Sequence, residues 1–366
     1  LAMTLEFRTL GKTGWNISAV ALGCWQIGGA WTASDDSNAH KAALNAYLDS
    51  GGNFLDTANV YGGPVGSDKF GWSEIVIREV LEARRAEGKD AGRRIYIATK
   101  AGRQSTKAAP EHCAARYTYE ELAESVAGSL SRLGVETLDL LQLHCPPQET
   151  LENPATFEAL RRLQAEKKIL HWGVSVETVT EAMLAIAQPD CATVQIIFNC
   201  FRLKPSVEFF AAAKAANVGI LARLPFASGL LTGKVTKEYI ASLDPASDHR
   251  VFNKGGEAFD KGESWSGLGM HLEDAALPAV EDLRDVLKRA QERGEVPPTT
   301  TLGRMALRWI LDHDAVSCVI PGARSVEQVT GNLATCIVPP LSATVHAEVK
   351  KVYETRVKAI IEAEKW

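Results

Sequence analysis

Eight short apolar segments recur along the chain, separated by stretches with helical periodicity. The segments cover residues 17–24, 53–57, 94–100, 138–144, 171–176, 193–199, 219–225 and 317–323. They are apolar at nearly every position, a pattern typical of strands that are buried on both faces of a parallel sheet. The pattern therefore predicts eight buried strands joined by helices.

The helical segments carry start and stop signals. Thr118 and Glu121 have the spacing of a capping box, and Gly134 ends the same segment. Asn153 and Pro154 are a favourable N-cap and first helical residue. A third segment, residues 277–294, places apolar residues at helical spacing and ends at a glycine. Strands that alternate with helices predict parallel βαβ units.

Eight such units favour a closed (β/α)8 TIM barrel, one domain over residues 3–366. We interpret Leu1 and Ala2, before Met3, as residues left from cloning. The alternative is a doubly wound sheet, which would carry a GxGxxG fingerprint after its first strand. Gly23 and Gly28 lie there without that spacing, so the barrel is the better interpretation.

Two stretches of the chain lie outside the eight predicted strand–helix units. Residues 6–16 have polar turn residues between short runs and predict an N-terminal β-hairpin that closes the bottom of the barrel. Residues 245–271, after the seventh predicted strand, are polar and rich in glycine. A loop of this length in a compact domain is often a lid, and we expect it to order over a bound ligand.

Composition excludes several classes of protein. The 366 residues are 46% hydrophobic and 23% charged, and the net charge is −5. No stripe of basic and aromatic residues predicts nucleic-acid binding. No apolar stretch approaches the roughly 18 residues of a membrane span. The start lacks the features of a signal peptide, so we expect a cytoplasmic protein.

The seven cysteines include no CxxC pair, and their number is odd. This usage favours reduced thiols over a disulfide framework or a zinc site. His112–Cys113 and His144–Cys145 are adjacent pairs, but neighbours in a strand point to opposite faces and cannot chelate one ion together. We therefore expect no metal, which argues against a metal-dependent barrel hydrolase.

Four polar residues follow consecutive predicted strands. Asp56 ends the second strand, Tyr61 lies in the loop after it, Lys100 ends the third strand and His144 ends the fourth. Singly, each has a structural explanation, as a turn cap, a packing tyrosine, a surface lysine or a core histidine. Catalytic groups of such barrels lie at the C-terminal ends of strands, so together the four predict a catalytic site.

These residue types suit the protonation of a carbonyl oxygen. A phenol has a pKa of about 10, and a nearby ammonium lowers it by favouring the phenolate. Aspartate would keep the lysine charged and oriented, and histidine would position the carbonyl oxygen. None of the four supplies a hydride, so this chemistry requires a cofactor.

The chain resembles the aldo-keto reductase family, with a bacterial-type subgroup most similar. The resemblance rests on FRTLGKTGWNISAVALG, GGNFLDTANVYG, IATK, LDLLQLH, WGVSV, VQIIFN, ASGLLTGK and IPGARSVEQVTGN. It implies Tyr61 as the general acid, tuned by Lys100 and Asp56, with His144 orienting the substrate. It also implies an extended nicotinamide dinucleotide across the barrel mouth. The residues expected to bind it are Gly23, Trp25, Asp56, Ser175, Gln195, Arg223, Leu224, Lys234, Gly322, Arg324, Gln328 and Asn332.

The segment after the eighth strand indicates which dinucleotide binds. Ser325 and Gln328 have capping-box spacing, which predicts a helix N-terminus that attracts phosphate. Arg324 precedes it and could clamp a 2′-phosphate. These residues favour NADP (NADPH) over NAD, and Lys234 is expected to contact the pyrophosphate.

Three positions depart from the family pattern. Val176 stands where Asn or Arg is common, Arg223 replaces an aromatic residue that stacks on the nicotinamide, and Gly331 replaces a glutamate near the adenine. Arg223 and Arg202 hint at an anionic or polyhydroxy substrate. The expected activity is reduction of an aldehyde or ketone to an alcohol. The alternative is a regulatory subunit that senses the cofactor, as potassium-channel β subunits of this fold do.

Overall fold

The computed structural model describes residues 4–28, 37–63, 67–103, 117–245, 248–253, 265, 268 and 271–363. An eight-stranded parallel sheet forms its centre, in the order β3 to β10 along the sheet. These strands are β3 (Leu22–Gly23), β4 (Phe54–Asp56), β5 (Tyr96–Ala101), β6 (Leu138–His144), β7 (Ile169–Ser175), β8 (Thr193–Ile197), β9 (Gly219–Arg223) and β10 (Val316–Val319).

The sheet closes on itself. Parallel bridges join Val20 to Val319 and Gly23 to Gly322, which connects the first strand of the sheet to the last. The backbone N–H of Ala21 donates to the carbonyl of Val319 over 2.9 Å. The (β/α)8 barrel predicted from the sequence is therefore confirmed.

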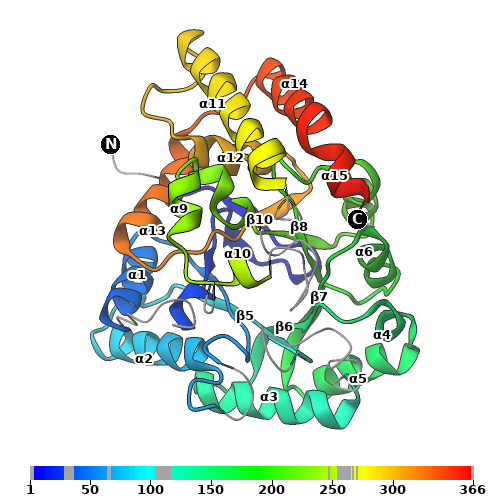
Figure 1. Cartoon of the computed structure of the whole chain (residues 1–366). Coiled ribbons are helices and arrows are strands. Elements are labelled where there is room, and N and C mark those ends of the chain that lie inside the picture. The colour runs from blue at the N-terminus through cyan, green and yellow to red at the C-terminus, as the bar shows by residue number, and fades with distance from the viewer. Residues whose placement is uncertain are drawn as a thin grey trace.

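The α-helices of the described residues are α1 (Ser37–Asp49), α2 (Trp72–Ala86), α3 (Tyr119–Leu133), α4 (Gln148–Glu152), α5 (Pro154–Ala165), α6 (Val179–Ile186), α7 (Lys204–Glu208), α8 (Phe210–Ala215), α9 (Lys237–Ala241), α10 (His249–Phe252), α11 (Leu277–Glu292), α12 (Leu302–Leu311), α13 (Val326–Leu333), α14 (Ala343–Val352) and α15 (Lys358–Ala363). Most of them surround the barrel, whereas α9 and α10 lie over one end of it (Figure 1). No helix of the described ranges is long and apolar enough to cross a membrane.

The predicted helix signals act as expected. Thr118 and Glu121 form both hydrogen bonds of a capping box at the start of α3, and Gly134 adopts the left-handed conformation at its end. The side chain of Asn153 accepts from the backbone N–H of Ala155 at the start of α5. These caps satisfy backbone groups that would otherwise lack partners at the helix ends.

The predicted hairpin is present as β1 (Phe7–Thr9) and β2 (Asn16–Ser18), which pair antiparallel. Leu10 and Ile17 of this hairpin are fully buried and join the apolar cluster inside the barrel. A Cβ on Gly219, which begins β9, would lie 2.5 Å from a methyl of Leu10. The hairpin therefore closes the barrel at the N-terminal ends of the strands.

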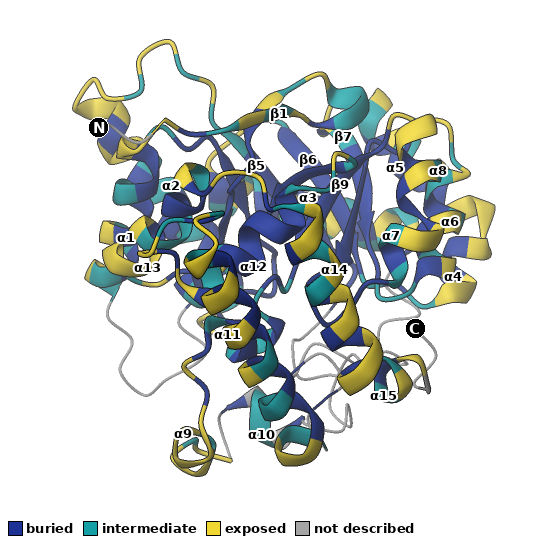
Figure 2. Cartoon of the chain, turned by 90° about the horizontal axis from the view of Figure 1, so that it is seen from above, coloured by how far each residue is buried: buried dark blue, intermediate teal, exposed yellow. Residues whose placement is uncertain are grey.

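Two apolar regions hold the fold together. The larger lies between the strands and the helices, and the smaller fills the lower barrel interior with Phe54, Ala98, Leu140, Leu221 and Cys318 among its members. Figure 2 shows the buried strands in the centre, the hairpin at one end, and α9 and α10 at the other. Most of the long loop expected as a lid, residues 245–271, lies outside the described residues.

Candidate active site

The alternation of side chains along the strands places polar groups directly above the apolar interior. Residues two apart in a strand face the same side of the sheet. Asp56 therefore follows Phe54 into the barrel, Lys100 follows Ala98, and Arg223 follows Leu221. All three polar residues end or nearly end their strands, so their side chains lie at the C-terminal mouth of the barrel.

The ammonium of Lys100 connects three of its neighbours. It donates to Asp56 Oδ1 over 2.5 Å, to the carbonyl oxygen of Thr57 over 2.8 Å and to the phenolic oxygen of Tyr61 over 3.2 Å. Lys100 is only 1% exposed. Burial alone would favour the neutral amine, but Asp56 and Tyr61 outweigh it and raise the pKa of Lys100. The lysine is therefore held charged beside the phenol.

The second carboxylate oxygen of Asp56, Oδ2, also accepts hydrogen bonds. It accepts from the side-chain amides of Gln195 over 2.7 Å and Gln142 over 3.2 Å. Gln195 also donates to Oε1 of Gln142 over 3.2 Å. Both carboxylate oxygens are thus occupied, which fixes the orientation of Asp56 toward Lys100.

Gln142 was not identified from the sequence as a residue of the candidate active site. It lies two residues before His144 on the same face of β6 and is fully buried. A polar residue within the apolar run LDLLQLH, in phase with His144, is the signal that could have identified it.

The loop after β4 positions Tyr61. The backbone N–H of Tyr61 donates to Ala58, and its carbonyl accepts from the N–H of Ser73 at the start of α2. Gly62 has φ = 128°, and a Cβ there would lie 2.2 Å from the carbonyl oxygen of Lys69. Only glycine fits this turn, which explains why the tyrosine is followed by one.

Two rings lie beside the phenol. The ring centroid of His144 is 5.9 Å from that of Tyr61 at an interplanar angle of 79°, and the centroid of Trp25 is 6.1 Å away at 27°. The carbonyl of His144 accepts from the hydroxyl of Tyr117 over 3.0 Å. The structure therefore brings together all four residues of the candidate catalytic set.

A cavity of about 1730 Å³ opens above these residues. Asp56, Tyr61 and His144 line it, whereas Lys100 lies beneath its floor. All twelve residues expected to bind the cofactor also line it: Gly23, Trp25, Asp56, Ser175, Gln195, Arg223, Leu224, Lys234, Gly322, Arg324, Gln328 and Asn332. Arg202 is buried and is not among the described residues that line the cavity, so its expected place near the substrate stays a prediction.

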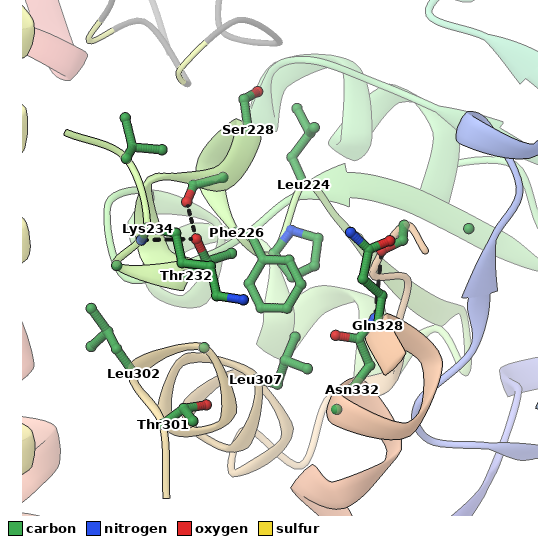
Figure 3. A pocket seen from close by; sticks show the side chains of 18 of the residues that line it. Leu224, Phe226, Ser228, Thr232, Lys234, Thr301, Leu302, Leu307, Gln328 and Asn332 are labelled. Carbon is green, nitrogen blue, oxygen red and sulfur yellow. Dashed lines mark hydrogen bonds between the residues drawn. The ribbon is translucent and has the colours of Figure 1, made fainter. Parts of the chain in front are cut away.

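The cavity extends from the barrel axis to helices α11, α12 and α13. Figure 3 shows this distal part, where Phe226 and Leu307 point into the space between the loop after β9 and α12. Lys234 approaches from the end of that loop, and Gln328 and Asn332 approach from α13. Both apolar and polar side chains therefore line this end of the cavity.

The start of α13 differs in detail from the predicted capping box. The side chain of Ser325 accepts from the N–H of Gln328 over 3.3 Å. Oε1 of Gln328 accepts from the N–H of Arg324 over 2.8 Å, rather than from Ser325. The helix begins where expected, and the guanidinium of Arg324 remains exposed at the edge of the cavity.

The cavity has polar atoms that suit a polar ligand such as a dinucleotide. Oγ1 of Thr300 and Oε1 of Gln26 are buried, belong to lining residues and have no hydrogen-bond partner among the described residues. Buried polar atoms in proteins are nearly always partnered by protein or by water, so these two could bond to a ligand or to water. The described part of the chain contains no cluster of three or more potential metal-binding side chains.

Comparisons with known proteins show which family the chain is similar to. A sequence model of the aldo/keto reductase family matches residues 19–354. The aldo-keto reductase YhdN of Bacillus subtilis is 27% identical over 89% of this chain and 87% of its own length. A probable voltage-gated potassium channel subunit beta of Arabidopsis thaliana is 28% identical over 97% of this chain and 98% of its own length.

Solved structures include the glycerol dehydrogenase AKR11B4 of Gluconobacter oxydans. It superposes with a TM-score of 0.70 at 26% identity and covers 97% of this chain and 96% of its own. The fold of this chain is therefore similar, over nearly its whole length, to that of a protein whose name describes an oxidoreductase.

Proposed function

Because this chain belongs to the aldo/keto reductase family, we propose that it reduces an aldehyde or ketone to an alcohol with a nicotinamide dinucleotide. The observation that carries the proposal is the hydrogen-bonded series Asp56–Lys100–Tyr61 at the floor of a large cavity. When bound, the dinucleotide supplies the hydride that no side chain of the site can supply.

Tyr61 acts as the general acid. An ammonium can only donate hydrogen bonds, so the phenolic oxygen accepts from Lys100, and a second acceptor is needed to receive the proton of the phenol. The carbonyl oxygen of a substrate in the cavity is that acceptor. Tyr61 would give its phenolic proton to this oxygen when the carbonyl is reduced, and its phenolate would then be reprotonated from solvent.

Lys100 and Asp56 prepare Tyr61 for this step. The charge of Lys100 stabilises the phenolate that remains after proton transfer. Asp56, held by Gln142 and Gln195, keeps Lys100 charged although it is buried. This arrangement exists before substrate binds, so little reorganisation is required during the reaction.

His144 positions the substrate. Its ring lies edge-on to Tyr61 at the cavity wall, so a carbonyl oxygen bound between the two rings lies within reach of both. Trp25, whose ring also lies beside Tyr61 and lines the cavity, provides an apolar surface for the rest of a small substrate.

The cofactor residues divide between the two ends of the cavity. Ser175 and Gln195 are polar and buried near the barrel axis, where they suit the carboxamide of the nicotinamide. Lys234 and Arg324, at the distal end, suit the pyrophosphate and a 2′-phosphate. This distribution supports NADPH as the preferred cofactor. For the substrate, we propose a polar carbonyl compound, for which the glycerol dehydrogenase named above is a precedent.

A second function has one specific observation in its favour. The similarity to a probable potassium channel subunit beta extends over almost the whole chain. A cofactor-sensing subunit would bind the dinucleotide but turn over slowly.

An assay that follows NADPH absorbance with glyceraldehyde, other sugars and simple aldehydes separates the two functions. Turnover that depends on Tyr61 supports the reductase. Tight NADPH binding without turnover across the panel supports the sensing subunit.

A further inference from the structure

A buried ion pair lies on the outer side of the barrel wall, behind Lys100. Thr99 and Lys100 are consecutive in β5, so their side chains face opposite sides of the sheet. Lys100 points to the mouth of the barrel, and the hydroxyl of Thr99, on the helix side, donates to Oε1 of Glu74 over 2.6 Å. Oε2 of Glu74 accepts from Nε of Arg132 over 2.6 Å. Glu74 is in the first turn of α2 and Arg132 in the last turn of α3.

Stability alone is a weak explanation for this ion pair. Glu74 and Thr99 are fully buried, and the side chain of Arg132 is 18% exposed. A buried ion pair often stabilises a fold no more than well-packed apolar residues of similar volume would. Neither Glu74 nor Arg132 is among the described residues that line the cavity, so any effect on the reaction passes through their neighbours.

Arg132 also holds the start of α2, on which the position of Tyr61 depends. The backbone N–H of Ser73, in the first turn of α2, donates to the carbonyl oxygen of Tyr61 over 3.1 Å. A Cβ on Gly71, the N-cap of this helix, would lie 2.2 Å from Nε of Arg132, so the guanidinium lies directly against the backbone there. The same guanidinium lies 5.0 Å from the ring centre of Phe70. Arg132 therefore fixes this turn, and Ser73 connects the turn to Tyr61.

The phenol and the ammonium of the site are thus connected through contacts outside the barrel. Glu74 follows Ser73, which holds the backbone of Tyr61. Through Thr99, Glu74 also holds the strand that carries Lys100. Inside the barrel the two groups are 3.2 Å apart, and a displacement of about 0.4 Å would bring them to a separation at which no hydrogen bond remains. Misplacement of an active-site group by about 1 Å can lower a rate by about 10²-fold.

We infer that Glu74 and Arg132 are positioning residues for the proton donor, and that their ion pair outside the barrel wall sets how Tyr61 meets Lys100 inside it. The inference rests on the proposed function, in which Tyr61 is the general acid. It gives the ion pair no contact with the substrate or the dinucleotide. Loss of the pair should therefore slow the reaction and leave the binding of both ligands unchanged.

The variant Arg132→Met tests this inference, because it removes the charge and keeps an unbranched side chain. The rate of a single turnover with NADPH and an aldehyde, the KM for that aldehyde and the Kd for NADPH are measured at a temperature at which every variant is folded by circular dichroism. We expect the single-turnover rate to fall by about 10–100-fold, with KM and Kd unchanged. Arg132→Lys keeps a charge beside Glu74 and should restore part of the rate.

Thr99→Val is a milder variant that decides the question if Arg132→Met does not fold. It removes only the hydroxyl that connects Glu74 to β5. Its single-turnover rate should also fall, with KM and Kd unchanged. An unchanged rate in whichever of the two variants is folded overturns the inference.

Arg84→Met is the matched control on the same helix. The side chain of Arg84 is 4% exposed, lies in the last turn of α2 and donates to Asp90 over 2.6 Å and to Asp49 over 2.8 Å. Its replacement also breaks a buried ion pair of α2, but at the opposite end from Ser73. It should lower stability and leave the single-turnover rate unchanged. An equal loss of rate in Arg84→Met would assign the effect to loosening of α2 in general and overturn the inference.

A double-mutant cycle shows whether Arg132 acts through Tyr61. Substitutions that act on the same group are not additive, so Arg132→Met should change the residual rate of Tyr61→Phe very little. The same fold-loss in both backgrounds overturns the inference, because Arg132 would then act on another part of the site. If the wild-type protein does not turn over with NADPH, the proposed function fails and this inference fails with it.

Discussion

The ammonium of Lys100 lies 3.2 Å from the hydroxyl oxygen of Tyr61 and 4.9 Å from the centre of its ring. The contact is directional, because the lysine has protons to donate and no lone pair to offer. Tyr61 thus accepts a hydrogen bond from Lys100 and lines the cavity. A phenol, ordinarily a poor acid at neutral pH, is placed where a proton donor is needed.

Replacing Tyr61 with Phe removes the proton donor and little else. We expect Tyr61→Phe to lower kcat for carbonyl reduction by about 10²–10⁴-fold or more. NADPH affinity should stay nearly the same, because the ring and its packing against Trp25 are retained. Stopped-flow reduction and fluorescence titration of NADPH measure the two quantities separately. Near-normal turnover in this variant would show that another group supplies the proton.

The exposed guanidinium of Arg324 is expected to select NADPH over NADH. A hydrogen bond to a charged group contributes roughly 1.5–3 kcal/mol, or about one to two decades in affinity. Arg324→Ala should therefore weaken NADPH by that factor and leave NADH almost unaffected. Lys234→Ala is the matched control, since the pyrophosphate proposed to contact Lys234 is common to both cofactors. Equal losses for NADPH and NADH in Arg324→Ala would rule out the 2′-phosphate contact.

Strand positions could be predicted from the sequence because they depend on local pattern. The eight apolar runs correspond to β3–β10, and the caps at Thr118 and Asn153 start their helices as expected. The barrel then followed from counting βαβ units. Tyr61 could be placed only approximately, in the loop after a strand, because its position depends on the backbone turn at Gly62 and on Ser73 of the next helix.

Long-range hydrogen bonds were beyond sequence reasoning. Gln142 and Gln195 are 53 residues apart but share Asp56, and no local pattern encodes that contact. Oε1 of Gln328 caps Arg324 instead of Ser325, a choice between neighbouring N–H groups that depends on side-chain conformation. Arg202 and Arg223 are both buried arginines at or near a strand end, but of these two only Arg223 is among the described residues that line the cavity.

Glu74 and Arg132 form a buried ion pair, and we expect that removing Glu74 lowers the stability of the fold strongly. Glu74 of α2 is fully buried, accepts from Thr99 over 2.6 Å and from Arg132 over 2.6 Å. Glu74→Leu would leave both donors without their acceptor. Breaking a buried pair costs about 3–5 kcal/mol. We expect roughly 2–4 kcal/mol in the free energy of unfolding here, because Arg132 keeps partial access to water.

Urea denaturation measures this difference. The exposed pair Lys41–Glu79 supplies the control, because Glu79→Gln should change stability by only about 0–1 kcal/mol. Equal effects from the two substitutions would show that Glu74 contributes nothing through its burial.

His313 should make the protein less stable in mild acid. It is packed against Phe198 and Trp309, its Nδ1 lies 2.9 Å from the carbonyl oxygen of Trp309, and burial lowers its pKa below 6.5. The unfolded chain therefore binds more protons than the folded one between the lowered pKa and about 6.5. Stability contributed by neutral His313 is complete above pH 6.5 and is lost as the pH falls through the folded pKa, at about 1.4 kcal/mol per unit of pKa depression. Urea denaturation from pH 5 to pH 8 should show this loss of stability.

The variant His313→Phe keeps the aromatic packing. It should reduce the slope of the free energy of unfolding against pH. The pKa of half-buried His171 is also lowered, so the double variant His171→Phe/His313→Phe should flatten the curve further. A slope that is the same in wild type and His313→Phe would mean that His313 titrates at the same pH whether the chain is folded or not.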